Sequence, residues 1–329
     1  MARFRVGIAS RARRLAVGTA LLLLALPAAS AAGNGRIFFT VGSQVPHVSE
    51  LWSVRDGGSD AQRLRPQMPV GPEGGTATLS RDASRILCIC RREEVDSVRL
   101  DGTHLRRLGL LPRAVRYDIV TLSSTGSAFW VKGYQRIVSR RAGTRTQRSF
   151  RGVVAREAVI DERVVPSPDG SRIAYVAYGC LDPICTDEDT ETLLIADPDG
   201  GNRTVVYRGG GLGKEIWEVA WSADGSRLIF SDGTGEGDPK GELPVSYPRQ
   251  WFVAPADGSN PSGTPVVLPL NASDPFFSPD ATRLVFSERT RSSVELWTAG
   301  ADGSDAVPML PTSCRDFRCE FPPRVFGWR

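Results

Sequence analysis

Two acidic segments in the second half of the chain carry residue types that could bind a cation or a basic partner. They contain Asp187, Glu188, Asp189 and Glu191 in the first segment, and Asp232, Glu236 and Asp238 in the second. Carboxylate oxygens are good calcium ligands, but neither segment has the ligand spacing of a defined calcium loop. We therefore interpret both as solvated acidic loops, which are candidates for contacting a partner, and we expect no metal site.

Other combinations of reactive residues are scarce. His47 and His104 are the only histidines, and they lack the spacing of a zinc site or a catalytic pair. The stretch 209–214 (GGGLGK) resembles a phosphate-binding loop, but no serine or threonine follows it. We expect a linker there, no catalytic residues and no cofactor.

Residues 1–32 have the composition of a secretory signal peptide. Five arginines and no acid precede a short apolar run, and small residues follow near Ala31 and Ala32. The apolar run is shorter than the roughly 20 residues that span a bilayer, which favours cleavage over a retained anchor. We therefore expect an exported protein, periplasmic or extracellular, without a stable membrane span after cleavage.

Six cysteines fit an exported protein with disulfides. Four of them form two pairs, each separated by four residues: Cys180 and Cys185, and Cys314 and Cys319. Each spacing allows a local disulfide. Cys88 and Cys90 alternate along an apolar stretch and are predicted to share one side of a strand, where disulfide geometry is rarely satisfied. We predict buried thiols at these two positions.

Without the predicted signal peptide the charge is almost balanced. Residues 33–329 contain 36 basic and 37 acidic side chains, so the domain has no general attraction to nucleic acid or anionic lipid. The distribution is uneven, because residues 81–163 hold 18 basic and 9 acidic groups, while residues 164–329 hold 14 and 24. We expect no nucleic-acid partner and a domain with one basic and one acidic side.

The acidic segments interrupt a repeated pattern. A frame of the form apolar–Ser–x–Asp–Gly/Ala–Ser/Thr–Arg–apolar recurs five times, with a degenerate second copy, at Ser80, Ser123, Ser167, Ser222 and Ser278. A second unit, typically ending in Asp-Gly, occurs six times. Asp-Gly between apolar runs is a strong hairpin signal, because glycine adopts the positive φ that tight turns require. Each repeat therefore predicts two hairpins, or four strands.

Repeats spaced 43 to 56 residues apart, with four strands each, are typical of a β-propeller, whose blades bury their faces against both neighbours. The second unit outnumbers the first by one, so one inner strand is missing. The C-terminal segment 322–329 (PPRVFGWR) is predicted to supply it beside residues 35–41. We predict an all-β, six-bladed β-propeller of four-stranded antiparallel blades over residues 33–329, closed by the C-terminal strand joining blade one.

These motifs resemble the TolB-type, WD40-like propeller family, in which SPDG hairpins followed by LW…DG hairpins build six blades. The resemblance covers about residues 35–329. TolB proper carries a separate N-terminal α/β domain, which we expect to be lacking here. The related prolyl-oligopeptidase propellers accompany a hydrolase domain, but this sequence has no G-x-S-x-G elbow. The resemblance therefore implies a fold, and one fold serves many functions.

The positions of the turns indicate where a partner would bind. The Ser-x-Asp-Gly and Asp-Gly turns share one face of the disc, so the longer connections, 178–191 and 231–249, lie at the opposite face. We expect an exported, non-catalytic, monomeric scaffold that binds a protein or a cell-envelope polymer through this loop-rich face. The alternative is an enzyme or small-ligand receptor that uses the central channel. Inner strands without histidines or clustered carboxylates favour the scaffold.

Overall fold

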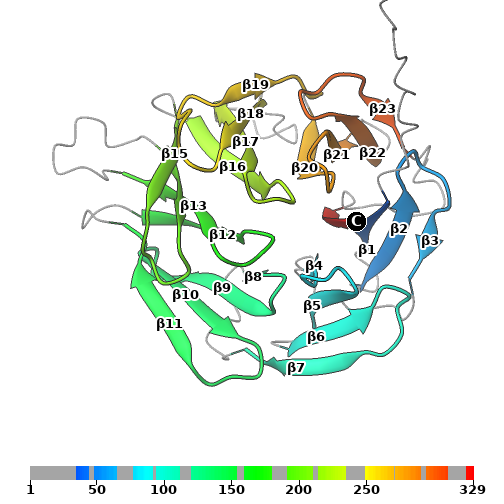
Figure 1. Cartoon of the computed structure of the whole chain (residues 1–329), viewed down its shortest axis with the longest axis horizontal. Helices are drawn as coiled ribbons and strands as arrows, with labels where there is room; N and C mark the ends of the chain where they lie inside the picture. The colour runs from blue at the N-terminus through cyan, green and yellow to red at the C-terminus, as the bar shows by residue number, and fades with distance from the viewer. Residues whose placement is uncertain are drawn as a thin grey trace, which may run out of the picture. The chain divides into compact units, whose positions relative to one another are not determined.

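The described part of the chain forms six four-stranded antiparallel sheets arranged in a ring (Figure 1). The computed structural model describes residues 35–43, 48–64, 77–91, 94–111, 120–153, 159–179, 191–209, 214–234, 249–269, 271–289, 294–309 and 324–329. All of them belong to the unit Gly33–Arg329. The predicted six-bladed propeller is confirmed.

Blades one to three each run from an inner strand at the centre of the ring to an outer strand at its rim (Figure 1). Blade one consists of β24 (Arg324–Trp328), β1 (Arg36–Ser43), β2 (Val48–Arg55) and β3 (Gln62–Arg63). Blade two consists of β4 (Ala77–Leu79), β5 (Arg85–Arg91), β6 (Glu94–Arg99) and β7 (Arg106–Leu110). Blade three consists of β8 (Thr121–Leu122), β9 (Ser127–Lys132), β10 (Arg136–Arg141) and β11 (Gln147–Arg151).

Blades four to six repeat this order. Blade four consists of β12 (Val159–Pro166), β13 (Ile173–Tyr178), β14 (Glu191–Ala196) and β15 (Thr204–Arg208). Blade five consists of β16 (Lys214–Trp221), β17 (Arg227–Thr234), β18 (Arg249–Pro255) and β19 (Thr264–Val266). Blade six consists of β20 (Ala272–Phe277), β21 (Arg283–Arg289), β22 (Val294–Gly300) and β23 (Val307–Pro308).

The C-terminal strand closes the ring, as predicted. β24 pairs antiparallel with β1, and the pairing ends where the backbone N–H of Arg36 donates to the carbonyl of Arg329 at 2.6 Å. The N–H of Arg329 donates back to the carbonyl of Arg36 at 2.9 Å. β1 therefore has a partner on both sides, and β24 takes the innermost position of blade one.

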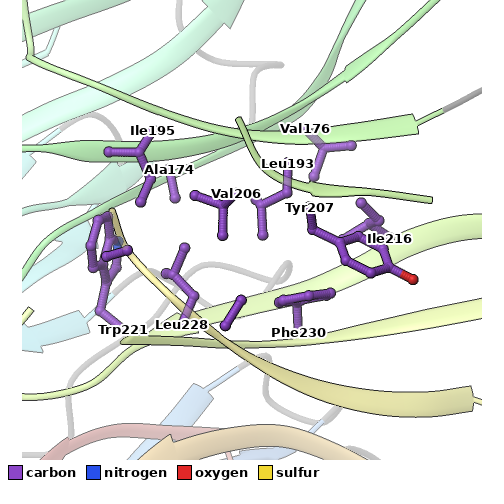
Figure 2. Packing of buried hydrophobic residues seen from close by; sticks show 12 residues of the cluster. Ala174, Val176, Leu193, Ile195, Val206, Tyr207, Ile216, Trp221, Leu228 and Phe230 are labelled. Carbon is purple, nitrogen blue, oxygen red and sulfur yellow. The ribbon is translucent and has the colours of Figure 1, made fainter. Parts of the chain in front are cut away.

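Apolar side chains bury the seams between blades. Among the described residues, six clusters each join two neighbouring blades. In the seam of blades four and five, Leu193 and Val206 pack against Leu228 and Phe230 (Figure 2). Because each sheet buries both faces in this way, the strands alternate less between apolar and polar residues than strands of a one-sided sheet would.

The Ser-x-Asp-Gly frame forms a turn that its own side chains close. In blade four, Ser167 Oγ donates to Asp169 Oδ1 at 2.7 Å and accepts the N–H of Arg172 at 2.9 Å. The same Asp169 oxygen accepts the N–H of Ser171 at 3.0 Å. Blades two, five and six repeat these contacts. Serine and aspartate therefore hold the hairpin through side-chain hydrogen bonds. An apolar residue at either position could not form them.

The arginine that ends the frame joins one blade to the next in blades four to six. Arg227 donates to the carbonyl of Ala281 at 2.6 Å and lies 5.5 Å over the ring of Phe277. Arg283 forms an ion pair with the mostly buried Asp56 of blade one at 3.0 Å. These contacts add polar links to the apolar seams.

The glycines of the second hairpins permit close approach as well as a positive φ. A Cβ atom at Gly303 (φ +86°) would lie 2.2 Å from the carbonyl oxygen of Val267 in blade five. A Cβ atom at Gly58 (φ +82°) would lie 1.7 Å from the carbonyl oxygen of Met309 in blade six. Both of these hairpins therefore rest directly on the outer part of the preceding blade.

Candidate functional site

The two predicted acidic segments begin and end at one seam of the ring, between blades four and five. The first connects β13 to β14, and the second connects β17 to β18. Five of the seven candidate residues lie outside the described part of the chain: Asp187, Glu188, Asp189, Glu236 and Asp238. Their role in binding stays a prediction.

Glu191 and Asp232 are described, and they are strand residues of β14 and β17 rather than loop residues. Their exposed fractions are 1% and 4%. The Glu191 carboxylate accepts the backbone N–H of Ile216, and Ile216 lies opposite Asp232 in the β16–β17 ladder. Two buried carboxylates therefore lie near Ile216, at the positions where the two acidic connections join the sheets. They anchor these connections and are too buried to be surface contacts.

Tyr207 belongs to the same cluster. Its hydroxyl donates to Asp232 Oδ2, while its ring packs on Phe230 with the centroids 4.6 Å apart. Figure 2 shows the hydroxyl directed away from the apolar seam. Burial first, and then the hydrogen bond to Asp232, raise the pKa of Tyr207. The phenol therefore stays protonated near neutral pH, and the pair is a fixed structural contact rather than a proton-transfer pair.

On the opposite face, the turn aspartates are already engaged in their own hairpins. Hydrogen bonds from Ser222 and Ser226 hold the pKa of Asp224 at about 2. Ser80 and Ser84 have the same effect on Asp82, whose pKa is also about 2. These carboxylates are charged at neutral pH and stabilise their turns, so this face has a structural explanation for its repeated acids.

The inner strands bring two acidic residues close together, contrary to the expectation that clustered acids would be lacking there. Glu218 of β16 accepts the backbone N–H of Asp274 in β20, whose φ is +49°. Asp274 lies in the irregularity between Ser273 and Phe276. Glu218 therefore fixes a strained bulge in the neighbouring blade, which is a structural role.

A second acidic pair lies away from the inner strands. Burial raises the pKa of Glu288 in β21, and the charge of Glu295, directly opposite in β22, adds to the effect. β21 and β22 are the second and third strands of blade six. The pair therefore gives no support to the alternative of chemistry in the central channel.

A cavity of about 420 Å³ lies beside the closed joint of the ring. Arg36 and Gln62 of blade one, Asp101 of blade two and Arg329 contribute to its lining. Arg36 is already bonded to Ser53 and to Asp60. The cavity adjoins the hairpin turns and the chain end, so it is separate from the acidic seam of blades four and five.

The cysteines depart from the prediction at one position. Cys88 is buried between blades one and two, with 1% exposed, and it is disulfide-bonded. The predicted thiol at Cys88 is therefore wrong, because the alternation argument excluded Cys90 as a partner and did not consider a more distant cysteine. The partner sulfur is not among the described side chains, because the side chains of all five other cysteines lie outside them: Cys90, Cys180, Cys185, Cys314 and Cys319. The two predicted local disulfides therefore stay predictions.

The described residues carry no cluster that could hold a metal ion, since no three His, Cys, Asp or Glu side chains among them are suitably arranged. Of the two histidines, His104 is exposed in a blade-two turn and His47 lies outside the described ranges. In the same part of the chain, no helix has the length and apolar character needed to cross a bilayer.

Comparison with known proteins identifies the fold. No family model matches the chain, and no curated protein matches its sequence. Among solved structures, TolB from Acinetobacter baumannii is similar with a TM-score of 0.56 and 13% identity, over 88% of this chain and 65% of that protein. The chain therefore spans less than two thirds of that relative.

Two further structures agree. A putative TolB from Agrobacterium tumefaciens gives a TM-score of 0.52 and 14% identity, over 84% of this chain and 88% of that one. A chain of a nidogen/laminin complex gives the same TM-score and identity, over 84% of this chain and 93% of that one. At this level of identity the likeness concerns architecture. The chain has the six-bladed propeller fold found in TolB structures.

Proposed function

We propose that this protein is an exported, non-catalytic β-propeller scaffold. It binds a protein or a cell-envelope polymer through one face of the ring. This face carries the connections between the second and third strands of the blades. The observation that carries the proposal is the asymmetry between the two faces. Side chains of the Ser-x-Asp-Gly turns are used to close their own hairpins, whereas both acidic connections leave the opposite face beside the buried residues Glu191 and Asp232.

Two further features support a binding role. The shifted pKa values at the blade-four and blade-five seam and in the hairpins belong to fixed contacts, such as Tyr207 with Asp232 and Asp224 with Ser222. A rigid ring that presents loops at one face suits recognition, because the scaffold fixes the positions at which the loops are rooted.

The proposal of export rests on the arginine-rich and apolar composition of residues 1–32.

The test replaces the acidic charges without shortening the chain. One variant carries Asp187→Asn, Glu188→Gln and Asp189→Asn. The matched control carries Asp199→Asn, Asp257→Asn and Asp302→Asn, which removes the same charge from exposed turns of the other face and keeps an acceptor oxygen in each turn.

The partner is first captured by cross-linking in the native envelope or medium and identified by mass spectrometry. Binding is then measured with both purified proteins. We expect the loop variant to raise the Kd about tenfold, since each exposed ion pair contributes up to about 1 kcal/mol. The control should bind like the wild type, and added salt should weaken binding. Equal affinities for all three proteins would show that the acidic segment 187–189 is not part of the recognition surface.

A further inference from the structure

The described part of the seam between blades one and two lacks an ion pair that the seam between blades six and one has. β1 and β21 are the second strands of their blades, and each begins with an arginine, Arg36 and Arg283. Arg283 crosses to blade one and pairs with Asp56, which directly follows β2. The residue that directly follows β6 in blade two is Leu100, which has no carboxylate. Arg36 therefore has no acidic counterpart at this position of blade two.

Arg36 binds within its own blade instead. Its guanidinium group donates to Ser53 Oγ at 3.0 Å and to Asp60 Oδ2 at 2.6 Å, where it forms an ion pair. The cavity of about 420 Å³ lies at this seam, and Arg36 and Leu100 both contribute to its lining. The cavity therefore lies where the contact between the two blades is missing.

The cavity combines an apolar wall with polar residues. Phe38 and Leu64 belong to the wall and are 2% and 6% exposed, and the half-buried Leu100 extends it. The exposed residues of the lining are Gly35, Gln62, Asp101 and Arg329. Sites for small molecules have volumes of about 300–1,000 Å³ and combine apolar walls with a few polar groups. The cavity has the size and composition of such a site.

Two residues of the lining carry opposite charges and do not pair with each other. Asp101 Oδ1 accepts the N–H and the hydroxyl of Thr103 at 2.8 and 2.7 Å. These bonds lower the pKa of Asp101, and the more distant charge of Arg99 adds to the effect. Arg329 donates from one nitrogen to the carbonyl of Ala83 at 2.7 Å. No ion pair joins Asp101 to Arg329 among the described residues, so one negative and one positive group remain apart at the same cavity.

We propose that this cavity binds a free α-amino acid with a large apolar side chain. The ammonium group of the ligand pairs with Asp101, its carboxylate pairs with the guanidinium group of Arg329, and its side chain covers the apolar wall. Hydrogen bonds between charged groups are the strong ones, and a guanidinium group is well shaped for a carboxylate. The ligand touches both blades and supplies a contact at this seam. The site is separate from the acidic connections of the proposed scaffold function.

A zwitterion fits the cavity better than a molecule with one charge or none. A ligand without an ammonium group covers Asp101 without replacing the water that solvates its carboxylate, which costs free energy. A ligand without a carboxylate does the same to Arg329. A ligand without an apolar side chain leaves the wall of Phe38 and Leu64 in contact with water.

The experiment titrates L-phenylalanine into the full propeller and measures the Kd by calorimetry. We expect binding, and we expect the amino acid to raise the Tm, because a ligand that binds the folded state alone stabilises it. Three analogues each lack one feature: 3-phenylpropionate has no ammonium group, 2-phenylethylamine has no carboxylate, and glycine has no apolar side chain. Each should bind at least about tenfold more weakly.

A charge variant with a matched control tests the contact with Asp101. Asp101→Asn removes the charge and keeps an acceptor oxygen for Thr103. The control is Asp302→Asn, because Asp302 Oδ1 accepts the N–H of Ser304 at 3.0 Å in the corresponding turn of blade six and is not part of the cavity lining. We expect Asp101→Asn to raise the Kd for L-phenylalanine about tenfold, and the control to change it by less than about twofold.

The same variant separates ligand contact from a role in the turn. Its affinity for 3-phenylpropionate should not fall, since that analogue has no ammonium group for Asp101, whereas damage to the turn would weaken both ligands. The proposal is overturned if the wild type does not bind L-phenylalanine, if one of the analogues binds as tightly, or if Asp101→Asn and Asp302→Asn bind alike. None of these results depends on the acidic segment 187–189.

Discussion

Removing the closing strand should open the ring at blade one. The change is deletion of residues 324–329, which make up β24 and the terminal residue. β24 buries Phe326 and Trp328, with exposed fractions of 8% and 5%, against blades two and six. It also pairs along β1 from Ile37 to Thr40. The deletion therefore removes both apolar contacts and ladder hydrogen bonds.

The expected loss is a large part of the stability of the domain. Burial of a large apolar side chain contributes about 1.5–3 kcal/mol, so the two aromatic residues alone account for roughly 3–6 kcal/mol. Each ladder hydrogen bond adds about 0.5–1.5 kcal/mol. A domain has about 5–15 kcal/mol in total. We expect the deleted protein to be largely unfolded or to self-associate through the exposed edge of β1.

Three measurements test this reasoning. Chemical denaturation gives the free energy of unfolding, light scattering after gel filtration gives the oligomeric state, and a synthetic peptide of residues 324–329 tests complementation. Phe326→Ala is the control, because it keeps the strand and should cost only about 3–5 kcal/mol. The peptide should restore a monomer to the deleted protein. A monomeric deletion variant with an unchanged Tm would refute the role of β24 in closure.

Three further predictions concern the turns and the cysteines. Gly58→Ala should lower the free energy of unfolding much more than Gly57→Ala, because both have positive φ but only the Gly58 Cβ would meet backbone of the neighbouring blade; equal losses in chemical denaturation would exclude the close contact. The lowered pKa of Asp224 adds stability that is present above pH about 4 and lost as the pH falls towards about 2. An acid titration followed by circular dichroism should therefore show that Asp224→Asn loses less stability between pH about 4 and about 2 than the wild type does. Non-reducing peptide mapping should find Cys88 in a disulfide, and a free thiol there would contradict the structure; if its partner is not Cys90, one of the two predicted local pairs cannot form.

The repeat of Ser-x-Asp-Gly frames was sufficient to predict the blades, because each frame is a local signal. Ser167, Asp169 and Arg172 lie within six residues of one another, and their contacts form inside one turn. The closing strand was predictable for a different reason. A count of hairpin units left one inner strand unassigned, and an apolar segment at the C-terminus remained to supply it.

The contacts between blades were not predictable in the same way. The frame shows that Arg283 follows a turn, but only the ring geometry brings it to Asp56, 227 residues away in the sequence. Likewise, glycine at position 303 was explained by its φ, while its contact with the Val267 backbone depends on how two sheets pack. The burial of Glu191 and Asp232 was missed because acidic residues beside a long connection are usually exposed.

The sequence shows the positive charge of blades two and three only as a number of residues, 18 basic and 9 acidic within residues 81–163. The register of β9, β10 and β11 adds that Lys132, Arg136 and Arg151 lie directly beside one another. A strand register is a property of the sheet, and charge counts along the chain do not reveal it.

The joint in blade one also determines how the ring responds to mechanical tension. β1 and β24 run antiparallel, and Arg36 and Arg329 are bonded at the same end of the ladder. A pulling force applied between residues 35 and 329 therefore acts on that end alone. The pairs break one after another from there, as a zipper opens, whereas a force along the strands would load all of them together. Blade one yields first under such a pull, and the five blades whose strands follow one another in the chain come under load only after it has opened.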